Sequence, residues 1–214
     1  ITIPSHVTSI EEYAFSQCIN LKKVTFLPNS ELQIIHKNAF YSTIIEEIFI
    51  PDHVTSIEEY AFSGCKNLKK VEFSPNSELK IIHCGSFSAT SIVEFIIPPH
   101  VIRIEKYAFK NCTKLNMLDF SHNSELKKIE SNAFGFTLIE SISIPTNVEL
   151  MNNWCAFVNK LNKIDLIPRE EKNIDYYNEK FIVGKTNPKQ DNFDVLLFAP
   201  RDTKSFKFPS FITK

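Results

Sequence analysis

Residues 50–71 read IPDHVTSIEEYAFSGCKNLKKV, and their recurrence along the chain predicts its architecture. Nearly the same letters occur at residues 3–24 and again at residues 97–118, so the segment recurs every 47 residues. A weaker copy starts one period later, at Ile144-Pro145. Self-similarity at a fixed period is typical of solenoids, in which each unit packs on its neighbours and the stack buries a continuous core.

Each period contains two similar halves. The first carries Ala14-Phe15 and an apolar segment that ends at Phe26, and the second carries Ala39-Phe40 and a segment that ends at Ile50. The structural unit is therefore about 22 to 25 residues long, within the range of leucine-rich repeats. About seven such units fit into residues 1–168.

The spacing inside one unit predicts a short strand and a short turn. Leu21, Val24 and Phe26 place apolar side chains at i, i+3 and i+5, so the last two share one face of a strand. The segment Glu11 to Phe15 is predicted to form a single helical or 3₁₀ turn on the opposite side of the coil. The expected fold class is therefore an α/β repeat.

The chain holds 19 Phe and only 4 Gly. The recurring rings are predicted to stack into one buried spine, with members Phe15, Phe40, Phe62, Phe87, Phe109, Phe134 and Phe157. Burial of each ring contributes about 1.5 to 3 kcal/mol, so we assign these residues to the core and not to a ligand site.

Residues 169–205 break the repeat and are predicted to contain an inserted β-hairpin. Its strands would be Phe181–Gly184 and Val195–Phe198, joined by a polar loop. Residues 206–214 resemble the start of the chain, so a further repeat is expected to begin there. On this pattern the chain is expected to be a fragment of a longer array.

Charge and hydropathy exclude two classes of partner. The 24 Lys+Arg nearly cancel the 25 Asp+Glu, and this balance argues against a surface for nucleic acid or for an anionic membrane. No stretch approaches about 20 consecutive apolar residues, so this fragment is not expected to insert into a membrane.

Three cysteines and three histidines recur with the 47-residue period: Cys18, Cys65 and Cys112, and His6, His53 and His100. Neighbours in each set are two units apart, which is about 10 Å at a strand spacing of about 4.8 Å. A disulfide needs Cα atoms within about 7 Å, and zinc ligands must converge on one point. We therefore expect no metal, and we interpret the cysteines as buried core positions and the histidines as structural or surface positions.

No catalytic motif is present. The sequence has neither a nucleophile elbow nor a zinc-protease motif, and the irregular region offers Glu170, Glu171, Asp175 and Lys185 without His or Cys. We therefore expect that the protein is not an enzyme and that it uses no cofactor.

The pattern Ile-Pro-x-x-Val-x-x-Ile-x-x-x-Ala-Phe-x-x-Cys-x-x-Leu-x-x-Val resembles the BspA-like leucine-rich repeats of bacterial and parasitic-protist surface proteins. Residues 4–24, 51–71 and 98–118 match it. The resemblance implies a right-handed solenoid without enzymatic activity, linked with attachment at cell surfaces, matrix binding and partner recognition. The fourth period departs from the pattern between Val148 and Cys155, where one extra residue and a lone Trp predict a local distortion.

If the apolar strand residues point inward, their neighbours point outward. The resulting candidate partner-binding face consists of Lys23, Thr25, Glu47, Phe49, Lys70, Glu72, Glu94, Ile96, Met117 and Asp119. The charges alternate from strand to strand, which favours cross-strand ion pairs. Phe49, Ile96 and Met117 are outward apolar residues, and such residues in proximity indicate a contact patch.

The sequence thus favours a non-catalytic protein-interaction module. The resemblance implies a cell-surface or secreted protein that adheres to a host or matrix protein. The alternative is a cytoplasmic scaffold or a self-assembling repeat protein, which the five cysteines and the absence of a visible signal peptide favour.

Overall fold

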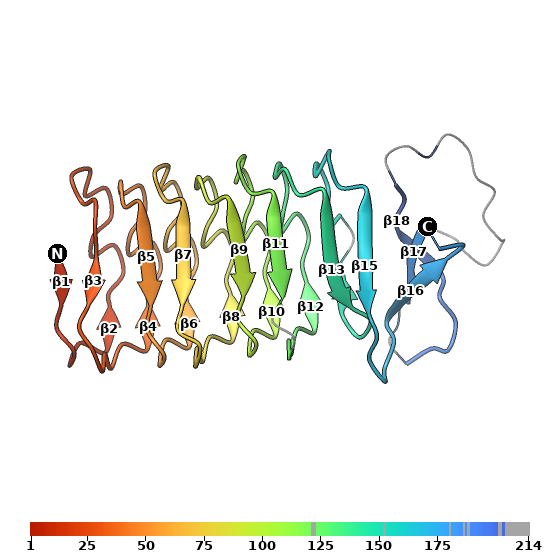
Figure 1. The fold of residues 1–214 in the computed structure, drawn as a ribbon, viewed down its shortest axis with the longest axis horizontal. Coiled ribbons are helices and arrows are strands. Elements are labelled where there is room, and N and C mark those ends of the chain that lie inside the picture. Colours follow the sequence, from red (N-terminus) through yellow and green to blue (C-terminus); the bar gives the residue numbers. More distant parts are fainter. Residues whose placement is uncertain are drawn as a thin grey trace.

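The computed structural model describes residues 1–120, 123–151, 153–179, 181–185, 187, 189–200 and 203. It shows an elongated right-handed solenoid of about seven coils (Figure 1). Each coil contributes a strand to one face, a two-residue strand to a second face and a turn segment that joins them.

The first face is built from parallel strands that follow one another in chain order (Figure 1). They are β1 (Thr2–Ile3), β3 (Thr25–Phe26), β5 (Glu47–Ile50), β7 (Lys70–Phe73), β9 (Glu94–Ile97), β11 (Met117–Phe120), β13 (Ser141–Pro145) and β15 (Lys163–Ile167). In β5, β9 and β11 the side chains alternate between exposed and buried, as the period of two in a half-buried strand requires.

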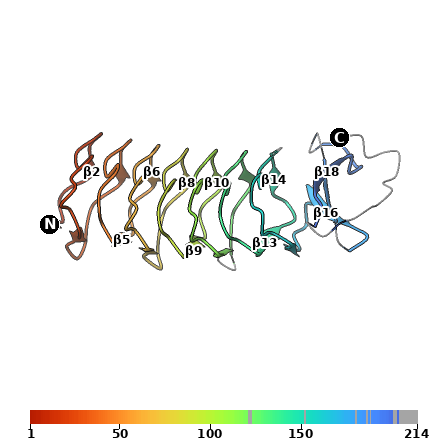
Figure 2. The ribbon, with the colours of Figure 1, turned by 90° about the horizontal axis from the view of Figure 1, so that it is seen from above.

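The second face is one continuous parallel sheet of seven short strands, which Figure 2 shows along the stack. These strands are β2 (Ser9–Ile10), β4 (Ile34–Ile35), β6 (Ser56–Ile57), β8 (Ile81–Ile82), β10 (Arg103–Ile104), β12 (Lys128–Ile129) and β14 (Glu149–Leu150). The second residue of each strand is buried, so this face closes the core on its side.

The first face, by contrast, is divided. Backbone ladders join β1 to β3, β5 to β7, β9 to β11 and β13 to β15, but among the described strands none joins β3 to β5, β7 to β9 or β11 to β13. We call these three gaps seams. Equivalent residues of β5 and β7, Glu47 and Lys70, are 23 positions apart, whereas Lys70 and its equivalent Glu94 across the seam are 24 apart.

The turn segments are not helical. No helix occurs in the described residues, so the prediction of helical or 3₁₀ turns is wrong. The Ala14 N–H donates to the Glu11 carbonyl within the turn (3.1 Å), but the Phe15 N–H donates to the Ala39 carbonyl of the next coil (2.8 Å). A 3₁₀ helix would use both N–H groups internally. Tyr13 has a left-handed backbone conformation with φ 59°. The chain turns there, and the N–H groups that follow point alternately within the coil and toward the next coil.

The same hydrogen bond between neighbouring coils recurs at the phenylalanine of the following coils. The donors and acceptors are Phe40 N–H to Ala61 O, Phe62 N–H to Ser86 O, Phe87 N–H to Ala108 O and Phe109 N–H to Ala133 O, at 2.8 to 3.0 Å. Each coil is therefore bonded to the next along the turn side as well as along the strands.

Six of the seven predicted rings form the spine. Phe15, Phe40, Phe62, Phe87, Phe109 and Phe134 stack in sequence with centroid separations of 5.2, 5.1, 5.5, 5.7 and 5.8 Å. All but Phe15 are fully buried. The seventh assignment is wrong, because Phe157 is 55% exposed and stacks on Phe136 outside the core.

Register explains the misplaced ring. Lys128 pairs with Glu149, 21 positions later, whereas Ile81 pairs with Arg103, 22 positions later. The last coil therefore carries one residue fewer at this point, and the predicted extra residue is wrong.

Trp154 and Cys155 occupy the places of Ala and Phe in that coil. The Trp154 N–H donates to the Met151 carbonyl as the Ala133 N–H does to that of Glu130. The indole is 1% exposed and meets the Phe134 ring edge-on at 6.3 Å, so it fills the space that a phenylalanine fills elsewhere.

Two of the three cysteines in the 47-residue ladder are buried. Each lies 3.1 Å from a carbonyl oxygen to which its thiol donates, Cys65 to Phe40 O and Cys112 to Phe87 O. Burial was therefore predicted correctly for these two and wrongly for Cys18, which is exposed in the first described coil.

A three-stranded antiparallel sheet follows the last coil. Its strands are β16 (Ile174–Tyr177), β17 (Phe181–Gly184) and β18 (Val195–Phe198). The Tyr176 hydroxyl donates to the Ile164 carbonyl at 2.7 Å, and Ile174, Ile182 and Phe198 belong to the same apolar core as the coils. The predicted start of a further repeat at residues 206–214 lies outside the described residues.

Phe62→Ala should lower the free energy of unfolding by about 3 to 5 kcal/mol, because it leaves a cavity between two stacked rings. Phe157→Ala removes the same atoms from an exposed ring and should cost about 1 kcal/mol or less. Urea melts followed by circular dichroism measure both effects. Equal midpoints for the two variants would contradict the assignment of the spine.

Cys18 should react with iodoacetamide in the folded protein at pH 8, whereas Cys112 should not. Burial raises the pKa of the Cys112 thiol to about 11 and also excludes the reagent. Mass spectrometry of tryptic peptides measures the two rates. In urea both residues should react. Equal reaction rates in the folded state would contradict the burial of Cys112.

The raised pKa of Cys112 also makes the stability of the folded state depend on pH. The folded state holds the Cys112 proton more tightly than the unfolded state, so this stabilisation is complete below the ordinary thiol pKa and is lost as the pH rises toward 11.

Candidate functional site

All ten side chains predicted for the candidate face are exposed. We call this set the outward strand face. It has two rows that run along the stack. The first row is Lys23, Glu47, Lys70, Glu94 and Met117, and the second is Thr25, Phe49, Glu72, Ile96 and Asp119.

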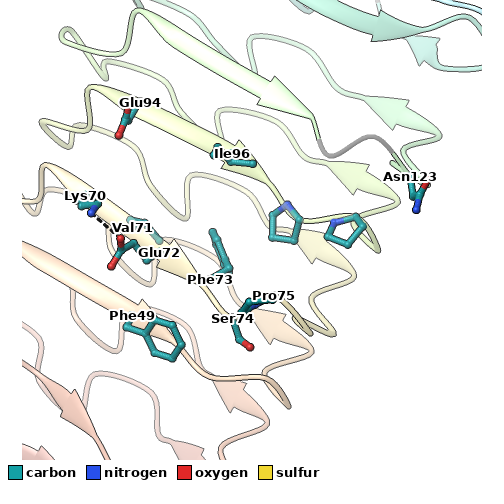
Figure 3. A pocket seen from close by; sticks show the side chains of 12 residues that line it. Phe49, Lys70, Val71, Glu72, Phe73, Ser74, Pro75, Glu94, Ile96 and Asn123 are labelled. Carbon is teal, nitrogen blue, oxygen red and sulfur yellow. Dashed lines mark ion pairs between the residues drawn. The ribbon is translucent and has the colours of Figure 1, made fainter.

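The lysines of this face are already paired. Lys23 contacts Glu47 across the β3–β5 seam at 3.7 Å, as the alternating charges predict. Lys70 instead pairs with Glu72 on its own strand (Figure 3), and this hydrogen bond raises the pKa of the Lys70 ammonium. The prediction that opposite charges pair from strand to strand therefore fails at Lys70.

Strand β11 breaks this arrangement. Met117 stands where β7 has Lys70, so Asp119 has no lysine beside it on its own strand. No ion pair joins Asp119 or Glu94 to another residue that the structure describes, although the Asp119 carboxylate accepts a hydrogen bond from the Phe120 N–H (2.8 Å).

A groove of about 750 Å³ lies along the seam between β7 and β9. Val71 and Phe73 form its floor, while Phe49 and Ile96 stand on either side (Figure 3). Phe73 is only half-buried, and its ring meets that of Phe95 edge-on at 5.6 Å. We call this depression the seam groove. It offers apolar surface that the strand ladders leave uncovered.

The two other seams are also hollowed, but less. Two separate depressions of about 410 and 310 Å³ lie along β3 and β5, and one of about 210 Å³ lies at β11 and β13. The seam groove therefore combines the greater volume with two of the three exposed apolar residues of the face.

Sequence reasoning identified the exposed side chains and missed the seam groove. Its further lining residues, Ser74, Pro75, Pro98, Pro99 and Asn123, come from loops that follow the strands. The spacing of 24 instead of 23 positions between equivalent residues marks this seam in the sequence, but the same spacing occurs at the other two seams.

The histidines tie neighbouring coils to one another. Their Nδ1 atoms lie close to a glutamate of the following coil in four pairs: His36–Glu58 at 3.1 Å, His53–Glu78 at 3.2 Å, His83–Glu105 at 3.3 Å and His100–Glu125 at 3.0 Å. These are structural or surface positions, as predicted. Within the described part of the chain, no three His, Cys, Asp or Glu side chains gather as metal ligands.

The described residues include no helix of the length and apolarity that a membrane span requires. The outward strand face itself presents exposed carboxylates and apolar side chains beside two lysines that already form ion pairs.

Comparison with solved structures supports the fold. The chain resembles the pneumococcal vaccine antigen PcpA with a TM-score of 0.61 and 22% identity, over 78% of this chain and 50% of that one. It also resembles a leucine-rich repeat protein from Bacteroides ovatus with a TM-score of 0.56 and 21% identity, over 78% and 60%. The chain thus spans half to three fifths of the length of these relatives. No curated protein matches it.

The family comparison is more specific. The model of the BspA type leucine-rich repeat region matches in six copies, over residues 1–116 and 80–182. The match covers most of the chain and includes every coil of the solenoid, which confirms the resemblance seen in the sequence. The protein belongs to the BspA-type leucine-rich repeat family.

Proposed function

We propose that this protein is an adhesive protein-interaction module that binds a host or matrix protein at its outward strand face. Leucine-rich repeat proteins of this kind typically bind protein partners and have no enzymatic activity, and BspA-type proteins are typically surface-associated. These family properties favour a location at the cell surface or in the secreted fraction.

One observation carries the proposal. Phe49, Ile96 and Met117 are 48%, 59% and 48% exposed on one face, and the first two border the seam groove. Large apolar side chains cost free energy in water, and gathering them beside a groove favours a protein contact. Stacked coils hold these side chains at fixed separations, so little ordering is needed when a partner binds.

A scaffold inside the cell is the second candidate. Four of the five cysteines, Cys18, Cys65, Cys84 and Cys112, are free thiols, which suits a reducing compartment. In that setting the same face would bind a cellular protein or another copy of the chain.

The test is binding of the purified protein to cultured cells and to immobilised matrix proteins. A variant with Phe49→Ser, Ile96→Ser and Met117→Ser should lose saturable binding, because it removes the apolar contact and leaves the core untouched. Urea melts of the variant should match those of the parent protein.

The matched control carries Phe136→Ser, Leu138→Ser and Phe157→Ser. These three residues are also large, apolar and exposed, but they lie outside the outward strand face. The control should bind like the parent. Absence of binding by the folded parent would contradict adhesion, and self-association in sedimentation experiments would then support the scaffold.

A further inference from the structure

Four residues of β9 and β11 form a small charge pattern that we call the β9–β11 quartet. In the register of the two strands, Glu94 lies opposite Met117 and Ile96 lies opposite Asp119. The two carboxylates therefore occupy one diagonal and the two apolar side chains the other. Diagonal neighbours on a sheet face are about 7 to 8 Å apart, within reach of one bridging group.

Other strands of this face neutralise the equivalent acid themselves. On β7, Lys70 pairs with Glu72, and on β15, Lys163 pairs with Asp165 at 2.9 Å. On β11 the lysine is replaced by Met117, so the quartet keeps two carboxylates without a described ion-pair partner. Across the seam, Lys70 forms its ion pair with Glu72 and interacts with the Glu94 charge only at longer range.

The quartet and the seam groove share two residues. Glu94 and Ile96 belong to the quartet on β9, and both also line the groove. The groove and the quartet are centred about one strand spacing apart, roughly 4.8 Å. Side chains i and i+2 of an extended peptide point the same way and lie about 6.5 to 7 Å apart. One extended segment therefore reaches both features with two alternate side chains.

We propose that the seam groove and the quartet together bind an extended partner segment in which an arginine stands two residues from a bulky apolar residue. The apolar side chain lies on Val71 and Phe73 in the groove, and the guanidinium lies between the carboxylates of the quartet. This inference rests on the proposed function, since it names the chemistry of the partner at the same face.

Arginine fits this site better than lysine for geometric reasons. Its planar guanidinium has five N–H donors in a fixed fork and bridges two carboxylates, whereas an ammonium is a compact point charge. Its aliphatic stem also covers apolar surface, which Ile96 and Met117 supply beside the acids. An acidic segment would be repelled by Glu94 and Asp119, since neither forms an ion pair with a residue that the structure describes.

The probe is a synthetic nine-residue peptide, acetyl-Ser-Gly-Ser-Leu-Ser-Arg-Ser-Gly-Ser-amide, added at millimolar concentration and low ionic strength. Methyl NMR of Ile96 and Met117 reports binding at the site itself. We expect saturable shifts of both methyl signals that weaken as salt is added. Replacing Arg by the neutral isostere citrulline, or Leu by Ser, should weaken binding about tenfold.

The decisive protein variant is Met117→Lys, which gives β11 the lysine that neutralises the acid on β7 and β15. It should weaken binding of the arginine peptide about tenfold without loss of stability. The matched control is Thr25→Lys, which adds the same charge to the same face about four strand spacings away. Both variants are compared with the parent at 0.1 M salt, where the Debye length of about 10 Å is shorter than that separation. The control should bind the peptide like the parent.

Three results would overturn the inference: no methyl shift with the arginine peptide, equal binding of the citrulline peptide, or full binding by Met117→Lys. The cell and matrix assay separates this failure from failure of the proposed function. If the triple serine variant loses adhesion and Met117→Lys keeps it, the face binds a partner of other chemistry. If neither variant changes adhesion, both proposals fall.

Discussion

The structure depends on the way the turn segments divide their backbone hydrogen bonds. One N–H closes the turn within its own coil, and the next is donated to the following coil, as at Ala14 and Phe15. The residue that donates to the next coil is also the one whose ring points into the core. Coil spacing and ring spacing are thereby coupled, which keeps the stacked centroids 5.1 to 5.8 Å apart from Phe15 to Phe134.

Local sequence patterns reveal the strands better than the turns. The alternation around Val24 and Phe26 fixes which side chains point inward, because the period of two is local. The sequence from Glu11 to Phe15 is typical of a helical turn. However, the carbonyl that accepts the Phe15 hydrogen bond belongs to Ala39, far along the chain. No local pattern reveals that the Phe15 N–H bonds to a carbonyl of the next coil, so the sequence wrongly predicts a helical turn here.

The arrangement of the last coil and the seam groove could not be predicted for a related reason. Both depend on which residues of neighbouring coils pair with one another. Ala156-Phe157 imitates the repeat motif, yet one residue fewer before Leu150 moves Trp154 and Cys155 into the core positions. The exposed residues of the outward strand face follow from alternation alone. The seam beside β7 instead follows from which strands form a ladder, and the significance of Met117 emerges only when β11 is aligned with β7.

The one-way direction of the turn bonds gives every coil two different faces. Along this edge a coil presents N–H groups to the coil that follows and carbonyl groups to the coil that precedes it. Two like faces related by a two-fold axis would oppose donor to donor or acceptor to acceptor. Coil-on-coil contact is therefore favourable only head to tail, which is a heterologous arrangement. The solenoid thus has a polarity like that of a filament, and a symmetric pair of such molecules must use its sides.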